Sequence, residues 1–175
     1  MAAGNTYTPI ATQTTSSAVA SVTFSSISGA YTDLVLVIDG KNTASGYAWG
    51  LQYNSDTAAN YSWTMFEGSG SAATTSRGSG AGYVGQSIYF AYNQGISDSL
   101  SNAIVSIQNY ANTTTYKSNL IRQNNPSSTN YPGLSAVVGM WRNTAAITSI
   151  TLLVPGAGTT IASGTTLTLY GIAAA

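Results

Sequence analysis

Carboxylates are the side chains here with the widest choice of chemistry, because a pair flanking a glycosidic bond can hydrolyse it. The chain of 175 residues has five: Asp33, Asp39, Asp56, Glu67 and Asp98. Asp33 and Asp39 stand at opposite ends of one expected strand, too far apart to share a bond. Asp56 and Glu67 lie near expected loop ends, where isolated carboxylates usually cap turns. We expect no catalytic residues and no enzyme; a carbohydrate lyase or hydrolase using Asp56 or Glu67 is the least favoured alternative.

Histidine and cysteine are both absent. Their absence excludes a histidine-based triad, a thiolate nucleophile and a zinc site with nitrogen or sulfur ligands. Asn54, Asp56 and Asn60 offer oxygen ligands for calcium, but their loop lacks the acidic spacing and terminal glutamate of an EF-hand. The glycine-rich stretch 68–85 lacks the Gly-Lys-Ser/Thr ending of a phosphate-binding loop. We expect no metal and no cofactor.

Arg142 follows Trp141 within an apolar stretch, where a cation could grip a phosphate or a carboxylate. No second basic residue adjoins it to complete an anion site. We therefore favour a structural role for Trp141 and Arg142. In this interpretation "VGMWR" and "ITSITLLV" are two strands of a hairpin turned at "NTAA". The arginine stem covers Trp141, and its head reaches carbonyls or a carboxylate.

Aromatic residues cluster between positions 47 and 66. Aromatic faces can stack on sugars or anchor protein interfaces, whereas alternate aromatics along strands often fill a core. Core packing or a subunit interface is the favoured interpretation, with a sugar platform as the alternative. The candidates for contact with a partner or a glycan are Trp49, Tyr53, Tyr61 and Trp63.

Apolar residues recur at period two or in short runs between turn residues, and no long window keeps helical spacing. Strands and turn signals alternate at the spacing of a sandwich or barrel. We predict one all-β domain, a jelly-roll-like antiparallel β-sandwich over residues 17–175, preceded by an extended polar N-terminal arm at 1–16. Segments 101–110 and 116–123 are expected to form a hairpin, and stretch 68–85 a flexible or partner-ordered loop.

Only 6% of the residues are charged, and the formal net charge is zero. Nucleic-acid binding needs clustered Lys and Arg, so we expect no nucleic-acid partner. No apolar run approaches the length that spans a bilayer, and the first residues lack a secretion-signal pattern, so we expect a soluble protein without a membrane partner. With little charge to keep copies apart, assembly is expected.

The order of segments resembles a family of small virion structural proteins of tailed bacteriophages, including cyanophages. The resemblance rests on "YTPIATQTTSSAVASVTFSSISGAYTDLVLVI", "LQYNSDTAANYSWTMFEGSGSAATTSRGS", "IQNYANTTTYKSNLIR", "VGMWRNTAAITSITLLV" and "TLTLYGI". It implies a β-sandwich subunit displayed on a virion, with no cofactor and no enzymatic residues to transfer.

On this resemblance we expect a capsid decoration, or cement, protein on the capsid surface, made in the cytoplasm of the host bacterium. Its partners would be the major capsid protein and copies of itself, as a homotrimer. Contacts are expected from the N-terminal arm and from loops 41–46, 68–85 and 124–133. The alternative is a tail or fibre component that binds host surface glycans.

Overall fold

The computed structural model describes residues 6–44, 48–88, 100–125, 133–155 and 158–173, without the side chains of 86–88 and 125. Every regular element in these residues is a strand. The strands are β1 (Tyr7–Thr14), β2 (Ser21–Phe24), β3 (Asp33–Gly40), β4 (Trp49–Tyr53), β5 (Tyr61–Gly68), β6 (Ala73–Ala81), β7 (Val84–Ile88), β8 (Ser101–Ile107), β9 (Lys117–Asn125), β10 (Gly133–Trp141), β11 (Ile150–Leu153) and β12 (Thr166–Ile172).

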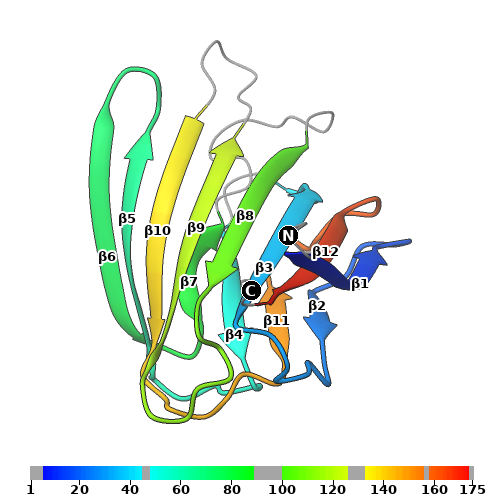
Figure 1. Cartoon of the computed structure of the whole chain (residues 1–175). Helices are drawn as coiled ribbons and strands as arrows, with labels where there is room; N and C mark the ends of the chain where they lie inside the picture. The colour runs from blue at the N-terminus through cyan, green and yellow to red at the C-terminus, as the bar shows by residue number, and fades with distance from the viewer. Residues whose placement is uncertain (1–5, 45–47, 89–99, 126–132, 156–157, 174–175) are drawn as a thin grey trace.

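The strands form two antiparallel sheets that pack as a sandwich (Figure 1). The larger sheet has eight strands in the order β1-β12-β3-β8-β9-β10-β5-β6, and the smaller has four in the order β2-β11-β4-β7. The expected all-β sandwich in a single domain is confirmed. The expected hairpin of the middle region is also present, because β8 and β9 pair antiparallel.

The connectivity is that of a jelly roll with additions. A jelly roll has eight strands, lettered B to I, in sheets of order B-I-D-G and C-H-E-F. The smaller sheet follows the first order, with β2, β11, β4 and β7 as B, I, D and G. The larger sheet follows the second, with β3 as C, β5 and β6 as E and F, and the meander β8-β9-β10 in place of H. Strands β12 and β1 extend the sheet beyond β3.

The core lies between the sheets and follows the period-two pattern of the strands. In β8 the residues alternate strictly between buried and half-buried. In β3, Leu34, Leu36 and Ile38 are fully buried, while Val35 and Val37 lie half-exposed on the outer face. The apolar run in β3 therefore covers both faces of a central strand, of which only one is packed in the described residues.

Residues 7–14 of the expected N-terminal arm form β1 at one edge of the large sheet. Strand β1 pairs antiparallel with β12 over its whole length, with an irregularity between Pro9 and Ala11. Exposed residues alternate with half-buried ones along most of β1, as they do in an edge strand with one face on the core.

The expected flexible loop at 68–85 is wrong for most of its length, because it contains β6 and the start of β7. The glycines and serines that disfavour regular structure are overridden by pairing with β5. A tight turn starts the pairing: the Ser69 N–H donates to the Ala72 carbonyl at 3.0 Å, and Gly70 takes a positive φ of 86°.

The expected hairpin of "VGMWR" and "ITSITLLV" is also wrong. Strand β10 lies in the large sheet, paired with β9 and β5, whereas β11 lies in the small sheet, paired with β2 and β4. The chain between them crosses from one sheet to the other. Ile147 in this crossing is buried, and its N–H donates to the Tyr110 carbonyl at 2.9 Å.

Candidate interaction surface

Large apolar side chains gather on the outer face of the eight-stranded sheet, where β5, β10 and β9 lie side by side. Five of them are exposed: Phe66 (49%), Leu120 (43%), Leu134 (57%), Val138 (54%) and Met140 (36%). This group, the outer patch, spans the three strands: Leu134, Val138 and Met140 share one face of β10, Phe66 of β5 pairs with Ala136 between them, and Leu120 of β9 pairs with Val138. Exposed clusters of this kind in soluble proteins commonly mark interaction sites.

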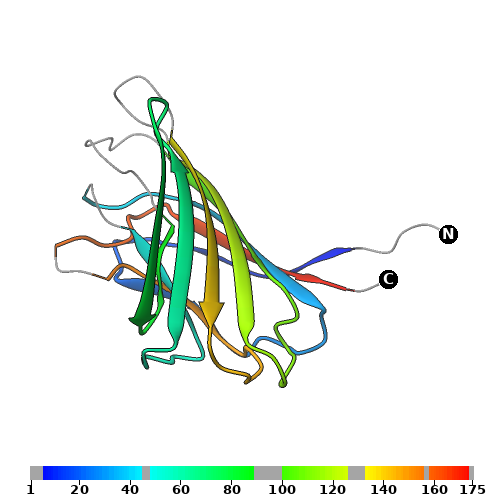
Figure 2. The same cartoon turned by 90° about the vertical axis from the view of Figure 1, so that its left-hand side faces the viewer.

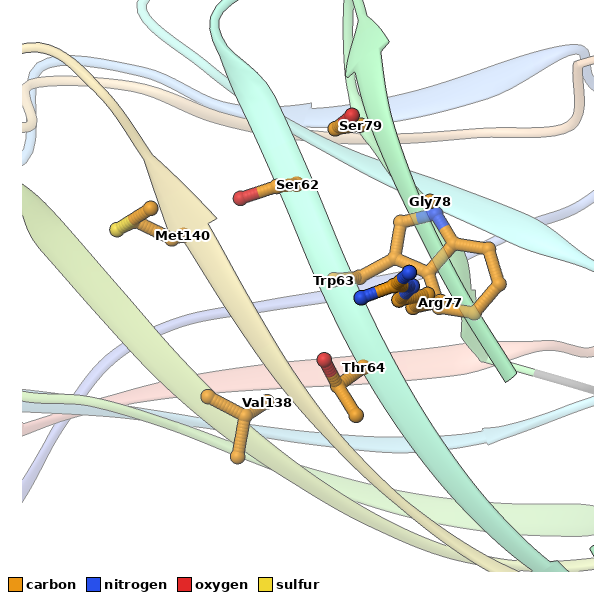
Figure 3. Close-up of a pocket in the computed structure, with 8 residues that line it drawn as sticks. All are labelled: Ser62, Trp63, Thr64, Arg77, Gly78, Ser79, Val138 and Met140. Atoms are coloured by element: carbon orange, nitrogen blue, oxygen red, sulfur yellow. The ribbon is translucent and has the colours of Figure 1, made fainter. Parts of the chain in front are cut away.

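A hollow of about 580 Å³ adjoins the outer patch over β10, β5 and β6. Its lining is Ser62, Trp63, Thr64, Arg77, Gly78, Ser79, Val138 and Met140. Figure 3 shows the apolar pair Met140 and Val138 on β10, with Ser62 and Thr64 on β5 beside them. Arg77 lies on β6, the next strand after β5, where it pairs with Thr64. The hollow offers hydroxyls, one cation and an apolar side.

Trp63 is the one residue of the expected aromatic contacts that stays half-exposed. Its side chain lies over two glycines. A Cβ atom on Gly78 would lie 2.7 Å from the indole Nε1, and one on Gly85 would lie 3.0 Å from the same atom. Gly78 belongs to β6 and Gly85 to β7, so the indole fills the space between the edges of the two sheets.

The other three expected contact residues, Trp49, Tyr53 and Tyr61, are fully buried. They have no exposed ring face for a sugar or a partner, so the interpretation of these three as contacts does not fit the structure. The core interpretation weighed beside it describes them. Trp49 is held from the side by a hydrogen bond from its Nε1 to Asn42 Oδ1.

Tyr53 and Tyr61 form an aromatic cluster with Trp141 between β4, β5 and β10. The Trp141 ring centroid lies 5.7 Å from that of Tyr53 and 6.3 Å from that of Tyr61, on which it stacks. The Tyr61 hydroxyl accepts from the Tyr53 N–H at 3.0 Å and donates to the Tyr53 carbonyl at 3.2 Å. Asn119 Nδ2 donates to the Tyr53 hydroxyl at 2.8 Å. Burial raises the pKa of both tyrosines well above the usual value.

Asp56 anchors this cluster from a loop. The Trp141 Nε1 donates to Asp56 Oδ2 at 2.7 Å, and Asn60 Nδ2 donates to the same oxygen at 2.9 Å. The Ala58 N–H donates to Oδ1 at 2.9 Å. Desolvation opposes ionisation of Asp56, but these hydrogen bonds outweigh it and lower the pKa of the carboxyl. Asp56 is therefore ionised, and it anchors both its own turn and the Trp141 side chain.

Arg142 continues this anchoring at the end of β10. Its Nη2 donates to the Ala59 carbonyl at 2.8 Å, and its backbone N–H donates to the Asn60 carbonyl at 2.8 Å. The guanidinium thus fastens the Asp56 loop to the strand end. This is the carbonyl contact expected from the sequence, made without the expected hairpin.

Asn54 has its own partners within the loops of the fold. Its Oδ1 accepts from the Thr148 N–H at 2.8 Å and the Ser149 N–H at 3.1 Å. Its Nδ2 donates to the Ala146 carbonyl at 2.7 Å. The described residues contain no group of three or more Asp, Glu, His or Cys side chains that could hold a metal ion.

Lys117 is a buried cation that the sequence analysis did not single out. It is 1% exposed, and its Nζ donates to the carbonyls of Thr115 at 2.8 Å and Thr144 at 3.0 Å. Desolvation lowers the pKa of this ammonium. The signal lies in "KSNLIRQ": Lys117, Asn119, Ile121 and Gln123 alternate with exposed residues and so share the buried face.

The described part of the chain contains no helix that is long and apolar enough to cross a membrane. Comparison of the chain with protein-family models, with curated proteins and with solved structures finds no match. The jelly-roll fold alone fits many functions, since capsid and lectin domains share it. The outer patch and the adjoining hollow are therefore the features that bear on function.

Proposed function

We propose that this chain is a structural protein of a tailed-bacteriophage virion, a capsid decoration protein that binds the major capsid protein on the head surface. The observation that carries the proposal is the outer patch, a group of exposed apolar side chains on three neighbouring strands of the large sheet. Exposed Phe, Leu, Val and Met on an open sheet face suit another protein surface better than a small molecule, which needs an enclosing cleft. The segment order that resembles virion structural proteins supports the same role.

The composition fits this role as well. Decoration of a capsid requires shape and many weak contacts rather than a reactive group. The described ionisable side chains mostly have structural partners: Asp56 and Arg142 hold a loop, and Lys117 bonds carbonyls at the end of the core. A largely uncharged surface with a rigid apolar patch is suited to a crowded, repeating partner lattice.

Antibody labelling of virions in negative-stain images tests the location, with label expected over the head. Label confined to tail tips would contradict the capsid assignment. Cosedimentation with heads that lack the chain tests the surface. Val138→Asp places a charge in the outer patch and is expected to abolish binding. The control Ser21→Asp adds the same charge at an exposed position on β2, in the other sheet, and is expected to bind normally.

A second candidate function is a tail or fibre component that binds a host glycan, and the hollow beside the outer patch favours it. The hollow combines an indole edge, hydroxyls and Arg77, the groups that sugars use for stacking and hydrogen bonding. Glycan-array binding that Arg77→Ala and Ser62→Ala each weaken would support this function. Binding that Val138→Asp abolishes on heads, with no glycan signal, would favour the capsid role.

A further inference from the structure

Strand β6 has an open edge. It pairs with β5 on one side, and no described strand pairs with it on the other. Figure 2 shows β6 and β5 at the end of the large sheet nearest the viewer. From Ala73 to Arg77 every residue of β6 is exposed, so neither face of this part of the strand is covered in the described structure. An open edge presents backbone N–H and carbonyl groups that can pair with another strand.

The turn before β6 determines which backbone groups point outward. The bond from the Ser69 N–H to the Ala72 carbonyl makes these two residues a hydrogen-bonded pair. Hydrogen-bonded and non-hydrogen-bonded pairs alternate along an antiparallel ladder. With the register of β5 and β6, the backbone groups of Thr74, Ser76 and Gly78 therefore point to β5. Those of Ala73, Thr75, Arg77 and Ser79 point to the open edge.

The other sheet edges are shorter or interrupted. Strand β1 carries Pro9 and an irregularity between Pro9 and Ala11. In the small sheet, the edge strand β2 has 4 residues and β7 has 5, against 9 in β6. Natural sheets protect their edges with prolines, bulges, charges and short strands. Strand β6 contains no proline and a single charge, Arg77.

We propose that β6 pairs antiparallel with β6 of a second copy, about a two-fold axis at Ser76. An edge strand paired in this way is self-complementary, because both copies offer the same outward groups. A centre at Ser76 pairs the outward groups of Ala73 with Ser79 and of Thr75 with Arg77 across the axis. The whole stretch 73–79 is then used, and it ends before Gly80, whose φ of 78° interrupts the extended backbone.

The charge of Arg77 selects this register. A centre at Arg77 would place the two guanidinium side chains directly opposite each other, and like charges in that position destabilise a sheet. A centre at Thr75 would run the pairing into the turn at 69–72 and leave Ser79 unpaired. With the centre at Ser76, each Arg77 lies opposite a threonine of the second copy.

The pairing joins two eight-stranded sheets into one and keeps both outer patches on the same side. The pairing does not depend on the proposed capsid role. It is complete with two copies, so we propose a dimer in place of the homotrimer expected from the sequence. The near-absence of charge removes the electrostatic repulsion that would oppose such an assembly.

Cysteine cross-linking tests the register, because the chain has no cysteine of its own. Residues facing each other in a non-hydrogen-bonded pair have Cα atoms about 4.5 Å apart, within the range of about 4.4–6.8 Å that a disulfide spans. Ser76→Cys under mild oxidation is expected to become mostly disulfide-linked dimer. In Thr74→Cys, on the same face, the two thiols are offset by about 14 Å along the strands, so little dimer is expected. Equal cross-linking of both variants, or none of either, overturns the register.

Sedimentation of the full chain tests the pairing itself. Thr75→Pro removes an outward N–H while leaving the bonds to β5, and is expected to shift the protein from dimer to monomer with an unchanged circular dichroism spectrum. Thr75→Ala keeps the N–H and is expected to remain a dimer. A wild-type monomer or trimer, or a Thr75→Pro dimer, overturns the proposal. Head binding is measured separately, so its failure leaves this result unaffected.

Discussion

The two ends of the eight-stranded sheet present different outer faces. At the β1–β12 end, hydroxyls pair across the strands: Thr12 with Thr168 at 3.1 Å and Thr14 with Thr166 at 3.0 Å between oxygens. At the β9–β10–β5 end, structurally equivalent outward positions carry the outer patch. The fold therefore does not require apolar residues at outward positions. Their gathering as a group of five on β5, β9 and β10 is a local feature of the sequence, and it supports a partner for that end.

The same two ends differ in where their aromatic contacts lie. The β5–β10 end has the cluster of Tyr53, Tyr61 and Trp141 in the core, tied to Asp56. At the other end the aromatic pair is Tyr7 and Tyr170, with ring centroids 6.2 Å apart in an edge-to-face arrangement, and Tyr7 is 58% exposed. The aromatic cluster behind the outer patch is thus buried, whereas the aromatic pair at the other end is partly exposed. A packed core behind a docking surface suits binding, because little ordering entropy is lost.

Removal of the buried anchor is expected to give the largest effect. Trp141→Ala leaves a cavity and removes one of the hydrogen bonds to Asp56, and should lower the free energy of unfolding by about 3–5 kcal/mol. Tyr7→Ala removes an exposed ring at the other end and should cost less than about 1 kcal/mol. Chemical denaturation followed by circular dichroism measures both. Similar losses in the two variants would contradict the difference in anchoring.

Gly78→Val tests how closely Trp63 closes the space between β6 and β7. Because a Cβ atom at Gly78 would lie 2.7 Å from the indole Nε1, the ring must move, at a cost of about 1–3 kcal/mol. The neighbouring Ser79→Val points away from the indole and is expected to change stability by less than about 0.5 kcal/mol. Thermal unfolding of the two variants gives the comparison. Equal melting temperatures would show that Trp63 does not pack against β6.

Alkaline pH should weaken the anchored end through its two buried phenols. The pKa values of Tyr53 and Tyr61 are raised in the folded protein, so above the usual tyrosine pKa of 10.0 the unfolded chain loses these protons first. Stability is present below that pH and falls above it, by about 1.4 kcal/mol per pH unit for each phenol. Lys117, whose pKa is lowered, acts in the opposite sense, but only below its usual pKa of 10.5, above which it is neutral in both states. In Tyr61→Phe, the free energy of unfolding from denaturation curves should depend less on pH above pH 10 than in the unchanged protein. An equal pH dependence would contradict the raised pKa of Tyr61.

Much of the fold followed from period-two patterns. The alternation in β8 and the turn residues before β9 predicted their hairpin. The aromatic-rich segments 47–53 and 61–67 contain β4 and all but the last residue of β5. Strand β6 escaped prediction because its Gly, Ser and Thr residues bury nothing, so only pairing with β5 makes it a strand. The crossing from β10 to β11 was missed because nearness in sequence favours a hairpin, whereas the core position of Ile147 requires a change of sheet.

The candidate surface was missed for a related reason. In "SAVVGM", Val137 is buried and Val138 is exposed, and in "NLIR" the same holds for Ile121 and Leu120. Adjacent apolar residues in a strand point to opposite faces, so such runs indicate that both faces are apolar. Which outward face lacks a covering layer depends on the arrangement of the two sheets, so the sequence does not reveal it.

The smallest effect on stability, and the sharpest test of the difference between the two ends, is expected from exchanging a methyl for a hydroxyl. Val138→Thr keeps the shape and the β-branching of an exposed residue, so stability should change by less than about 0.5 kcal/mol. Binding to phage heads should nevertheless weaken, because the hydroxyl must be desolvated against the partner. Thr168→Val makes the reverse exchange at the β12 end and loses only an exposed hydroxyl pair. It should leave head binding unchanged. Equal effects of the two exchanges on head binding would mean that the outer patch has no special role in binding. A loss of binding confined to Val138→Thr would show that the patch binds the head, independently of the stability of the sheet that carries it.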